Sequence, residues 1–307
     1  MDAPRSAGSP PGRGPFSFLV YDSMPQASSI LPAGAYRAEL RAAVRAARAG
    51  ARAAMPFYGE QASRAKDDGS PVTAADEAAH RAIARVLARE FPDDAVLSEE
   101  ARDPAGRMDA RRVWIVDPLD GTREFLARNG EFAVMVGLAV DGRAVAGAVV
   151  LPATGVLYAA AEGQGAWVAH EGRRRRLRAR PAPAGAPRLV GSRSHPDPLL
   201  VTMQEALGIT DVRPAGSVGI KCALVAEGER DLYVHPVPYL KEWDTCAPEV
   251  VLREAGGTVT DCRGEPLAYN KADPRQPHGI LAAAPGVAER AGPVLMRVYA
   301  AAAGGGE

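Results

Sequence analysis

Residues 113–122 read VWIVDPLDGT, and this stretch indicates both the fold and the chemistry of the chain. Its apolar first half is typical of a buried strand, which ends in the carboxylate of Asp117. Pro118 has no N–H to continue a hydrogen-bonded ladder, so we expect the strand to stop there. A second carboxylate, Asp120, follows three residues after the first.

The turn after this strand supplies groups that suit a phosphate. Gly121 allows a tight backbone turn, and Thr122 brings a hydroxyl to the same place. Two carboxylates and the carbonyl of Leu119 make a hard-cation site, and free N–H groups at a turn bind anions. The stretch therefore indicates divalent-metal chemistry on a phosphate, although ordinary turn chemistry explains the same residue choices.

Composition argues against several classes of protein. The 307 residues include 37 basic and 37 acidic side chains, and this balance gives no sign of a nucleic-acid or membrane partner. The apolar runs are of strand length and predict no transmembrane helix. Cys222, Cys246 and Cys262 are odd in number and lack Cys-x-x-Cys spacing, which argues against disulfides or structural zinc and fits a reducing cytoplasm.

Residue patterns divide the chain into two lobes. Residues 1–34 are rich in Pro, Gly, Ser and Ala, and we interpret them as a flexible extension without the order of a signal peptide, or as an overlong gene start. The pattern over 35–185 predicts helices on a largely antiparallel sheet. Alternating strands and helices over 186–302 predict a mixed α/β lobe, with the boundary in the Pro/Ala linker 181–187 and a loose tail at 303–307.

Acidic residues recur at the ends of the predicted elements. Asp76 falls in the first turn of a helix, Glu99 follows a short strand, and Asp244 opens a later helix. Each position has an ordinary explanation, since an acidic first turn complements the helix dipole and adjacent Glu residues often form a solvated rim. Mg²⁺ takes a few oxygen ligands from separate segments, so their placement together with Asp117 and Asp120 suggests one metal site.

Arg173–Arg176, with Arg178 and Arg180, form the only dense run of charge in the chain. Such a run is able to bind RNA or phosphate, but no aromatic residue is interleaved with it. We interpret it as a solvated loop before the linker and expect no nucleic-acid partner.

Two longer patterns resemble known signatures. Residues 117–125, DPLDGTREF, resemble the first signature of the inositol monophosphatase superfamily. Residues 243–257, WDTCAPEVVLREAGG, resemble its second signature, and the resemblance extends over about residues 36–285. Within the superfamily the chain looks most like the CysQ-type 3′(2′),5′-bisphosphate nucleotidases. The stretches that favour this branch are 70–76, 97–100, 123–132 and 192–195.

The resemblance implies a fold and a metal site. The fold is α/β (α+β), a layered αβαβα sandwich with the active site between two lobes. Glu99, Asp117 and the Leu119 carbonyl are expected to bind one Mg²⁺. Asp117, Asp120 and Asp244 are expected to bind a second, with Asp117 bridging the two ions.

The resemblance also implies the catalytic groups. Thr122 paired with Asp76 would orient and deprotonate a water for in-line attack, without a covalent phosphoenzyme. The amides of Gly121 and Thr122 would hold the scissile phosphate at a helix start. A third, weaker Mg²⁺ near Asp76 and Glu99 is proposed for relatives.

Substrate contacts are implied at four further positions. In nucleotidase relatives, the positions that match Ser192, His195, Ser217 and Lys221 hold the nucleotide and its non-scissile phosphate. Hydroxyls, an imidazole and an ammonium group make a reasonable phosphate clasp. Without the family, His195 beside Pro196 is more readily interpreted as a capping or turn residue.

We therefore expect a cytoplasmic phosphoric monoester hydrolase, a monomer or homodimer, that removes the 3′-phosphate of adenosine 3′,5′-bisphosphate to give AMP and phosphate. Its sulfated form is a further candidate substrate, which would link the enzyme to sulfur metabolism, and lithium sensitivity is expected from the resemblance. An inositol or sugar phosphate phosphatase with the same metals is the nearest alternative. A non-catalytic protein that senses a nucleotide or binds RNA is the alternative from another class.

Overall fold

The computed structural model describes residues 34–59, 63–65, 71–194 and 197–304 of the 307-residue chain. Almost all of the predicted N-terminal extension, and His195, therefore lie outside the described residues. Within the described part, no helix is long and apolar enough to cross a membrane.

The first half of the chain builds a seven-stranded sheet in the order β3-β4-β5-β6-β7-β8-β9. β3 and β4 are parallel and every later pair is antiparallel, so the prediction of a largely antiparallel sheet is confirmed. The turn at Asp141–Gly142 joins β5 to β6, and both of its residues have positive φ, 49° and 76°. The strands are β3 Ala95–Ser98, β4 Arg112–Asp120, β5 Ala133–Val140, β6 Arg143–Leu151, β7 Val156–Ala161, β8 Gly165–His170 and β9 Arg173–Leu177.

The second half builds a five-stranded mixed sheet in the order β11-β10-β12-β14-β13. β10 is parallel to β11 and β12, because helices carry the chain across between these strands, and β14 is antiparallel to both of its neighbours. A separate antiparallel pair, β1 and β2, lies before α2. These strands are β1 Ser63–Ala65, β2 Pro71–Thr73, β10 Leu189–Ser192, β11 Val212–Ala215, β12 Leu232–His235, β13 Thr258–Thr260 and β14 Ile280–Ala283.

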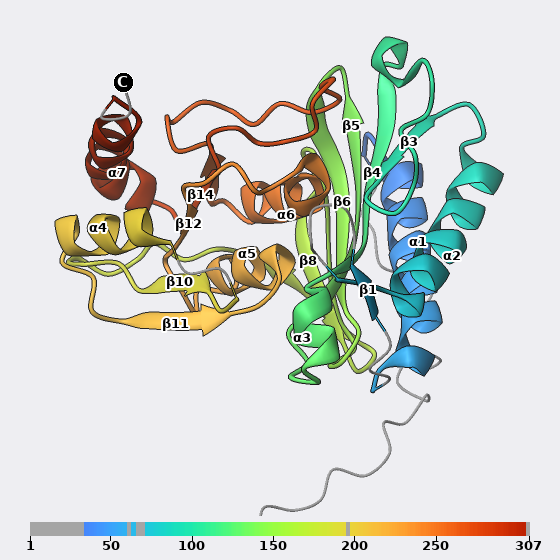
Figure 1. Cartoon of the computed structure of the whole chain (residues 1–307), viewed down its shortest axis with the longest axis horizontal. Coiled ribbons are helices and arrows are strands. Elements are labelled where there is room, and N and C mark those ends of the chain that lie inside the picture. The colour runs from blue at the N-terminus through green and yellow to red at the C-terminus, as the bar shows by residue number, and fades with distance from the viewer. Residues whose placement is uncertain (1–33, 60–62, 66–70, 195–196, 305–307) are drawn as a thin grey trace, which may run out of the picture.

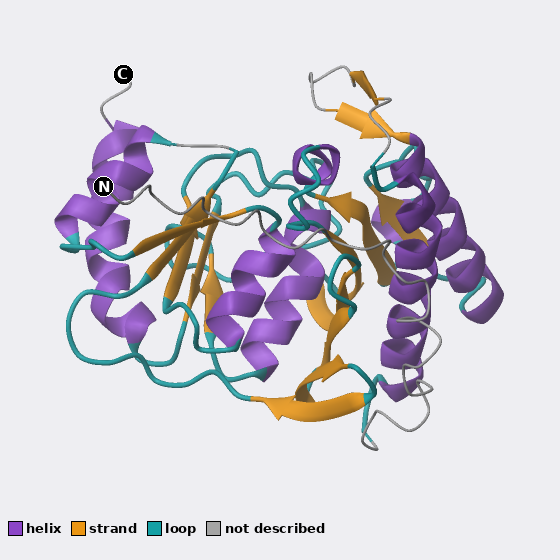
Figure 2. Ribbon diagram, turned by 90° about the horizontal axis from the view of Figure 1, so that it is seen from below, coloured by secondary structure: helices purple, strands orange, loops and turns teal. Residues whose placement is uncertain are grey.

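Helices form three layers around the two sheets (Figures 1 and 2). α1 and α2 cover the outer face of the seven-stranded sheet, α5 and α6 lie between the sheets, and α4 and α7 cover the far face of the five-stranded sheet. The predicted αβαβα sandwich is confirmed, although α7 continues to Gly304 where a loose tail was expected from residue 303. The helices are α1 Arg37–Ala54, α2 Ala74–Glu90, α3 Thr122–Leu126, α4 Pro198–Ala206, α5 Val218–Ala226, α6 Glu242–Glu254 and α7 Val287–Gly304, with 3₁₀ turns at Met55–Phe57 and Arg107–Asp109.

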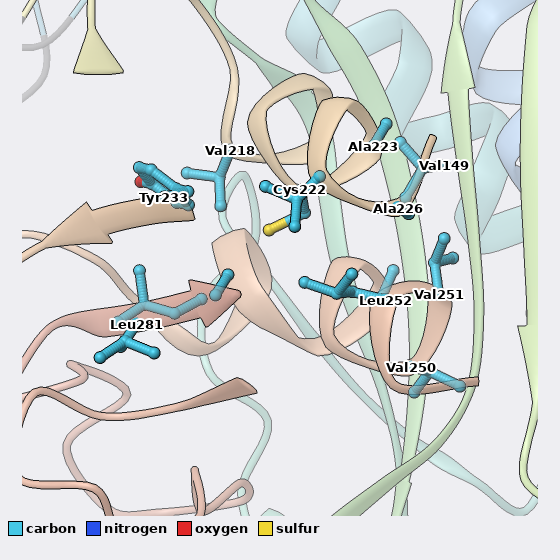
Figure 3. Close-up of a cluster of buried hydrophobic side chains, with 14 of the residues drawn as sticks. Val149, Val218, Cys222, Ala223, Ala226, Tyr233, Val250, Val251, Leu252 and Leu281 are labelled. Atoms are coloured by element: carbon cyan, nitrogen blue, oxygen red, sulfur yellow. The ribbon is translucent and has the colours of Figure 1, made fainter. Parts of the chain in front are cut away.

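α6 approaches the seven-stranded sheet so closely that only glycine fits beneath it. Gly137 on β5 and Gly147 on β6 are direct cross-strand partners. A Cβ added at Gly147 would lie 2.7 Å from the carbonyl oxygen of Ala247, and one at Gly137 would lie 2.5 Å from the sulfur of Cys246. Around this contact, α5 and α6 fill the apolar core between the sheets (Figure 3). The glycine pair therefore sets the height of Asp244, in the first turn of α6, above the sheet.

β4 contains a β-bulge that its sequence did not reveal. The strand was expected to stop at Pro118. It instead continues to Asp120 with a shift of register. Asp117 pairs with Met135 and Asp120 with Ala133, so three steps on β4 match two on β5. In a regular strand, side chains three residues apart point to opposite faces, whereas the extra residue brings both aspartates to one face. That face is the one covered by α5 and α6, because Met135 and Ala133 belong to the core of that layer.

Arg173–Arg176 lie in a hairpin, as expected, but they form one of its strands, β9, and not a loop. β9 is the last strand of the seven-stranded sheet, and its four arginines are exposed as expected. Arg174 and Arg176 lie over the ring of Trp167, with guanidinium carbons 5.3 Å and 5.6 Å from its centroid. The run therefore belongs to a regular sheet, far along the chain from the acidic positions.

Candidate active site

Three carboxylates from two elements converge at the end of β4. Asp117 and Asp120 flank the bulge, and Asp244 is the third residue of α6. One oxygen from each lies within 4.8 Å of the others, and this group, which we call the carboxylate cluster, could hold a metal ion. Asp117 is 1% exposed and Asp120 is 8% exposed, whereas Asp244 is partly exposed, so the cluster is largely buried.

The first turn of α6 orients Asp244. Its Oδ2 accepts a hydrogen bond from the backbone N–H of Lys241, three residues earlier, at 2.6 Å. This bond satisfies an N–H group at the helix start that has no partner within the helix. The helix therefore holds the Asp244 carboxylate in place where it faces Asp117 and Asp120.

Burial and repulsion disfavour negative charge on all three carboxylates. Burial raises the pKa of Asp117 well above its usual range, and the charges of Glu99, Asp120 and Asp244 raise it further. Burial likewise raises the pKa of Asp244, with Asp120 and Glu99 as the contributing charges. The pKa of Asp120 is raised by burial against the opposing influence of Lys221. A bound divalent cation would relieve this repulsion.

Asp76 comes to the same region from the outer helical layer, as the third residue of α2. Its Oδ2 accepts hydrogen bonds from the N–H of Thr73 at 2.8 Å and from the Thr73 hydroxyl at 2.6 Å. Its Oδ1 accepts from the Thr122 hydroxyl at 3.2 Å. That hydroxyl is also 3.2 Å from the Leu119 carbonyl oxygen, so its one proton has two acceptors.

Glu99 lies at the edge of the carboxylate cluster. It follows β3, and its N–H donates to the Val116 carbonyl at 3.2 Å, which holds it beside β4. Glu99 is not among the three carboxylates within 4.8 Å of one another, but its charge raises the pKa of Asp117 and of Asp244. It is therefore close enough to act on the cluster electrostatically.

Asp120 links the cluster to the start of α5. Its Oδ2 accepts from the Ser217 hydroxyl at 2.5 Å and from the N–H of Gly219 at 3.0 Å. The same hydroxyl accepts from the N–H of Ile220 at 3.2 Å. Ser217 also has a φ of 55°, a region that residues with side chains seldom adopt. Ser217, expected to contact substrate, thus donates its hydroxyl proton to a carboxylate of the cluster.

Lys221 is a buried cation beside the cluster. It is 4% exposed, and its Nζ lies 5.3 Å from the centroid of the Tyr233 ring. Burial lowers the pKa of Lys221, while the charge of Asp120 acts in the opposite direction. An ammonium group in this position can serve as a fixed point charge for an anion.

A cavity of about 220 Å³ brings these groups together. Asp76 lies behind Thr122 and is not among its lining residues. The expected site residues that line it are Glu99, Asp117, Leu119, Asp120, Gly121, Thr122, Ser192, Ser217, Lys221 and Asp244.

Several residues of the cavity wall were not predicted from the sequence. Arg123 and Glu124 come from α3, His235 from the end of β12, and Tyr239 from the loop before α6. The available signal for His235 was its position at the carboxyl end of a strand, where α/β folds place ligand-binding residues. No sequence pattern distinguished Tyr239.

A buried glutamate beside Asp244 connects α6 to a distant loop. Glu242 is fully buried and accepts from the N–H groups of Asn270 at 2.6 Å and Lys271 at 2.9 Å. The side-chain oxygen of Asn270 accepts from Arg107 at 2.7 Å, in the segment between Glu99 and β4. This network joins the first turn of α6 to the segment that follows Glu99.

The fold and the carboxylate cluster are those of a known family. A sequence model of the inositol monophosphatase family matches residues 36–298. The chain therefore belongs to the inositol monophosphatase family, and the resemblance inferred from its two signatures is confirmed.

Among individual relatives, the higher sequence identities belong to bisphosphate nucleotidases. The 3′(2′),5′-bisphosphate nucleotidase CysQ of Escherichia coli (strain K12) is 45% identical over 207 residues, which cover 66% of this chain and 81% of that protein. The 3′-phosphoadenosine 5′-phosphate phosphatase of Mycobacterium tuberculosis (strain CDC 1551 / Oshkosh) is 37% identical over 219 residues, covering 68% and 76%. The crystal structure of CysQ from Bacteroides thetaiotaomicron has a TM-score of 0.69 and 34% identity, covering 81% and 98%. An inositol monophosphatase from Anabaena (Nostoc) sp. PCC 7120 also has a TM-score of 0.69, with 27% identity and coverage of 86% and 97%.

Proposed function

We propose that the protein is a Mg²⁺-dependent phosphoric monoester hydrolase that converts adenosine 3′,5′-bisphosphate to AMP and phosphate. The observation that carries the proposal is the buried carboxylate cluster, which shares one cavity with Thr122 and Lys221. The named activities of two relatives, at 45% and 37% identity, support this substrate. The sulfated nucleotide is the second substrate that we propose, because it shares the 3′-phosphate.

The donor set of the cluster fits Mg²⁺. This ion prefers oxygen ligands and keeps several waters, so a few carboxylates and one carbonyl are sufficient. The raised pKa values of Asp117 and Asp244 support the assignment, because burial and mutual repulsion disfavour both anions without a cation. We propose that Glu99, Asp117 and the Leu119 carbonyl hold one ion and that the cluster holds a second. A third, weaker ion is proposed near Glu99 and Asp76.

The chain's own groups orient the attacking water in this proposal. Bound Mg²⁺ would neutralise phosphate oxygens and lower the pKa of water. Thr122 would accept a hydrogen bond from that water at Oγ1 and donate its own proton to Asp76 Oδ1, the contact already present at 3.2 Å. Thr73 holds the other oxygen of Asp76 through two hydrogen bonds, which keeps Oδ1 turned toward Thr122. The amides of Gly121 and Thr122 would donate to the scissile phosphate.

The choice of a nucleotide over another phosphate ester depends on cavity residues other than the metal ligands. Lys221 offers a fixed positive charge for a second phosphate, and Ser192 offers a hydroxyl in the same cavity. We propose Ser217 as a contact by resemblance, and its hydroxyl would donate to a phosphate only by releasing Asp120. We propose His195 as a further contact by resemblance. An inositol or sugar phosphate phosphatase with the same metals is the alternative, since the 27% identical inositol monophosphatase has a similar fold.

Phosphate release by the purified protein with Mg²⁺ tests the proposal. The substrates are adenosine 3′,5′-bisphosphate, inositol 1-phosphate and fructose 1,6-bisphosphate. We expect a preference for the first, with a loss of more than about a hundredfold in Asp117→Asn, because even partners of metal ligands change activity by 10–100-fold. Asp141→Asn is the matched control, since it changes an exposed carboxylate in a surface ion pair.

Other outcomes of this assay select between the alternatives. A preference for inositol 1-phosphate would keep the metal site and overturn the nucleotide assignment. No turnover of any substrate, despite Mg²⁺ binding, would favour a non-catalytic nucleotide-binding protein. We propose the cytoplasm as the compartment, because the three cysteines are free and buried as in reducing environments.

A further inference from the structure

The loop between β12 and α6 presents an aromatic ring at the active-site cavity. Tyr239 is 72% exposed, yet it lines the same cavity as Lys221 and Asp244. It is the most exposed of the large hydrophobic side chains on the surface of the described residues. The others, which do not line the cavity, are Met108, Val201 and Val212. An exposed ring at a ligand cavity keeps apolar surface available for a ligand.

The backbone on both sides of the ring is fixed by packing. Two of the three residues before Tyr239 are prolines, which restrict the chain. After it, the carbonyl of Leu240 accepts from the N–H of Gln276 at 2.7 Å, and the Leu240 side chain is buried. Before it, a Cβ added at Gly279 would lie 1.8 Å from the His235 carbonyl oxygen, so these two backbones are in close contact. The backbone that carries the ring therefore needs little reordering when a ligand binds.

The cavity is lined by two kinds of side chain. The carboxylate cluster, Thr122 and Lys221 suit metal ions and phosphates. The buried side chains of Leu240 and Val218 and the exposed ring of Tyr239 offer apolar surface. A ligand that matches both kinds carries phosphates together with a flat, weakly polar group. A nucleoside bisphosphate has this shape, whereas an inositol or sugar phosphate lacks the flat group.

We propose, on the basis of the proposed function, that Tyr239 is the stacking surface for the substrate's nucleobase and so selects nucleotides over base-free phosphate esters. Every base offers a π face, so stacking recognises bases as a class and needs no hydrogen-bond pattern. Removal of one such ring weakens binding by roughly 5- to 150-fold. The same contact favours the larger purine face over a pyrimidine.

Kinetics with and without a base test this inference. KM and kcat are measured for adenosine 3′,5′-bisphosphate, cytidine 3′,5′-bisphosphate and glycerol 2-phosphate in the wild type, Tyr239→Ala and Tyr239→Phe. We expect Tyr239→Ala to raise KM for the adenosine substrate at least about fivefold more than for glycerol 2-phosphate. Tyr239→Phe retains the ring and should restore the preference, including that for adenosine over cytidine. Val201→Ala is the matched control, a 52% exposed apolar side chain on α4. Equal changes for all three substrates in Tyr239→Ala would overturn the inference.

Calorimetric titration with AMP separates this inference from the proposed function. The titration needs no turnover, so it remains informative if the wild type hydrolyses none of the esters and the proposed function fails. Tighter AMP binding by the wild type and Tyr239→Phe than by Tyr239→Ala would then still support the stacking surface. Wild-type AMP affinity in Tyr239→Ala, or no AMP binding by the wild type, would overturn it even if the bisphosphate is hydrolysed.

Discussion

Asp76 and Asp244 occupy the same position in two helices on opposite faces of the seven-stranded sheet (Figure 1). Each is the third residue of its helix and accepts a hydrogen bond from the N–H three residues earlier, at 2.8 Å from Thr73 and 2.6 Å from Lys241. Their neighbours differ. Asp244 faces two other buried carboxylates, whereas Asp76 accepts protons from the hydroxyls of Thr73 and Thr122.

This difference shows that one local arrangement supports two kinds of chemistry. An acidic side chain at the third helical position satisfies a free N–H wherever a helix begins. Whether it then faces other carboxylates or a hydroxyl depends on what the rest of the fold brings to it. For Asp244 this is the bulge of β4, and for Asp76 it is the turn that carries Thr122.

The largest expected effect comes from removing one charge at each aspartate. Asp244→Asn should lower activity about a thousandfold and abolish the Mg²⁺-induced rise in melting temperature, because a bound metal ion supplies several kcal/mol of charge stabilisation. Asp76→Asn should lower activity about a hundredfold, as for a group that handles a proton, and keep most of the Mg²⁺-induced rise. Phosphate release and thermal unfolding with and without Mg²⁺ measure both. If Mg²⁺ stabilises the two variants equally, the distinction between the sites is wrong.

A substitution in the sheet beneath α6 should displace Asp244 without changing that residue. In Gly147→Ala the added Cβ meets the Ala247 carbonyl, so α6 must move, at a cost of about 1–3 kcal/mol in the free energy of unfolding. We expect the Mg²⁺ concentration for half-maximal activity to rise about tenfold or more, since small misplacements of reacting groups cost up to a hundredfold. Gly191→Ala is the control, because its Cβ would meet only Val212 at 3.7 Å. Unchanged Mg²⁺ dependence in Gly147→Ala would contradict the role assigned to this contact.

The stability of the metal-free protein should depend on pH through the cluster. The folded-state pKa values of Asp117, Asp120 and Asp244 are raised, so the folded protein binds protons more tightly than the unfolded chain. Their favourable contribution is therefore present at acidic pH and is lost as pH rises through the raised values. With chelator, we expect the melting temperature to fall as pH rises above the ordinary titration range of an Asp carboxyl, by roughly 2 °C for each unit by which a pKa is raised.

Two comparisons isolate the cluster in this experiment. Saturating Mg²⁺ should flatten the pH dependence, because bound metal keeps the carboxylates charged at all these pH values. Asp244→Asn should reduce the slope without metal. Carboxylates with a lowered pKa, such as Asp103 and Asp231, stay charged at these pH values and cannot produce the fall. His80, whose pKa is lowered by burial, adds a rise with pH, so the test is the difference between the curves. A slope that neither Mg²⁺ nor Asp244→Asn changes would be inconsistent with raised pKa values in the cluster.

The smallest expected effect concerns the N-termini of α2 and α6, which differ in whether a side chain caps the helix. Thr73→Ala removes a hydroxyl that caps α2 and bonds Asp76, and should cost about 1 kcal/mol in the free energy of unfolding. Thr73→Ser keeps the hydroxyl and should remain within about 0.5 kcal/mol of the wild type. Lys241→Ala gives up a contact with the Trp243 ring, 5.2 Å from Nζ to the centroid, but should cost less than Thr73→Ala, because α6 uses the backbone N–H of Lys241. Denaturant unfolding measures the free energy of unfolding of all three variants. An equal loss of stability in Thr73→Ala and Lys241→Ala would show that the two helix starts do not differ in their use of the side chain.

Local patterns predicted most of the fold because helix starts and turns depend on the residues within a few positions of them. Thr73 and Asp76 mark the start of α2 by their capping groups, and Asp141–Gly142 marks a hairpin because its residues tolerate positive φ. The same patterns, with the two family signatures, also indicated the acidic residues of the candidate site, three of which the fold brings together.

What the sequence could not supply is geometry that depends on distant partners. The bulge in β4 exists only relative to its pairing with β5, and without it Asp117 and Asp120 would point to opposite faces. Asp244 is far along the chain from both, so its convergence with them follows from the packing of α6 on Gly137 and Gly147. Tyr239 lacks even a local signal, because a tyrosine in a proline-containing loop is ordinary until a cavity lies beside it.

The arginines of β9 have a consequence for the solubility of the folded protein. β9 ends the seven-stranded sheet, and the N–H and C=O groups of an edge strand can pair with a strand of another molecule. Two copies that joined edge to edge through β9 would bring two sets of four exposed arginines together. Like charges would oppose that growth, most strongly at low ionic strength, where their repulsion is least screened. Although Arg175 is paired with Glu227, the net charge of the run would therefore oppose edge-to-edge pairing through β9.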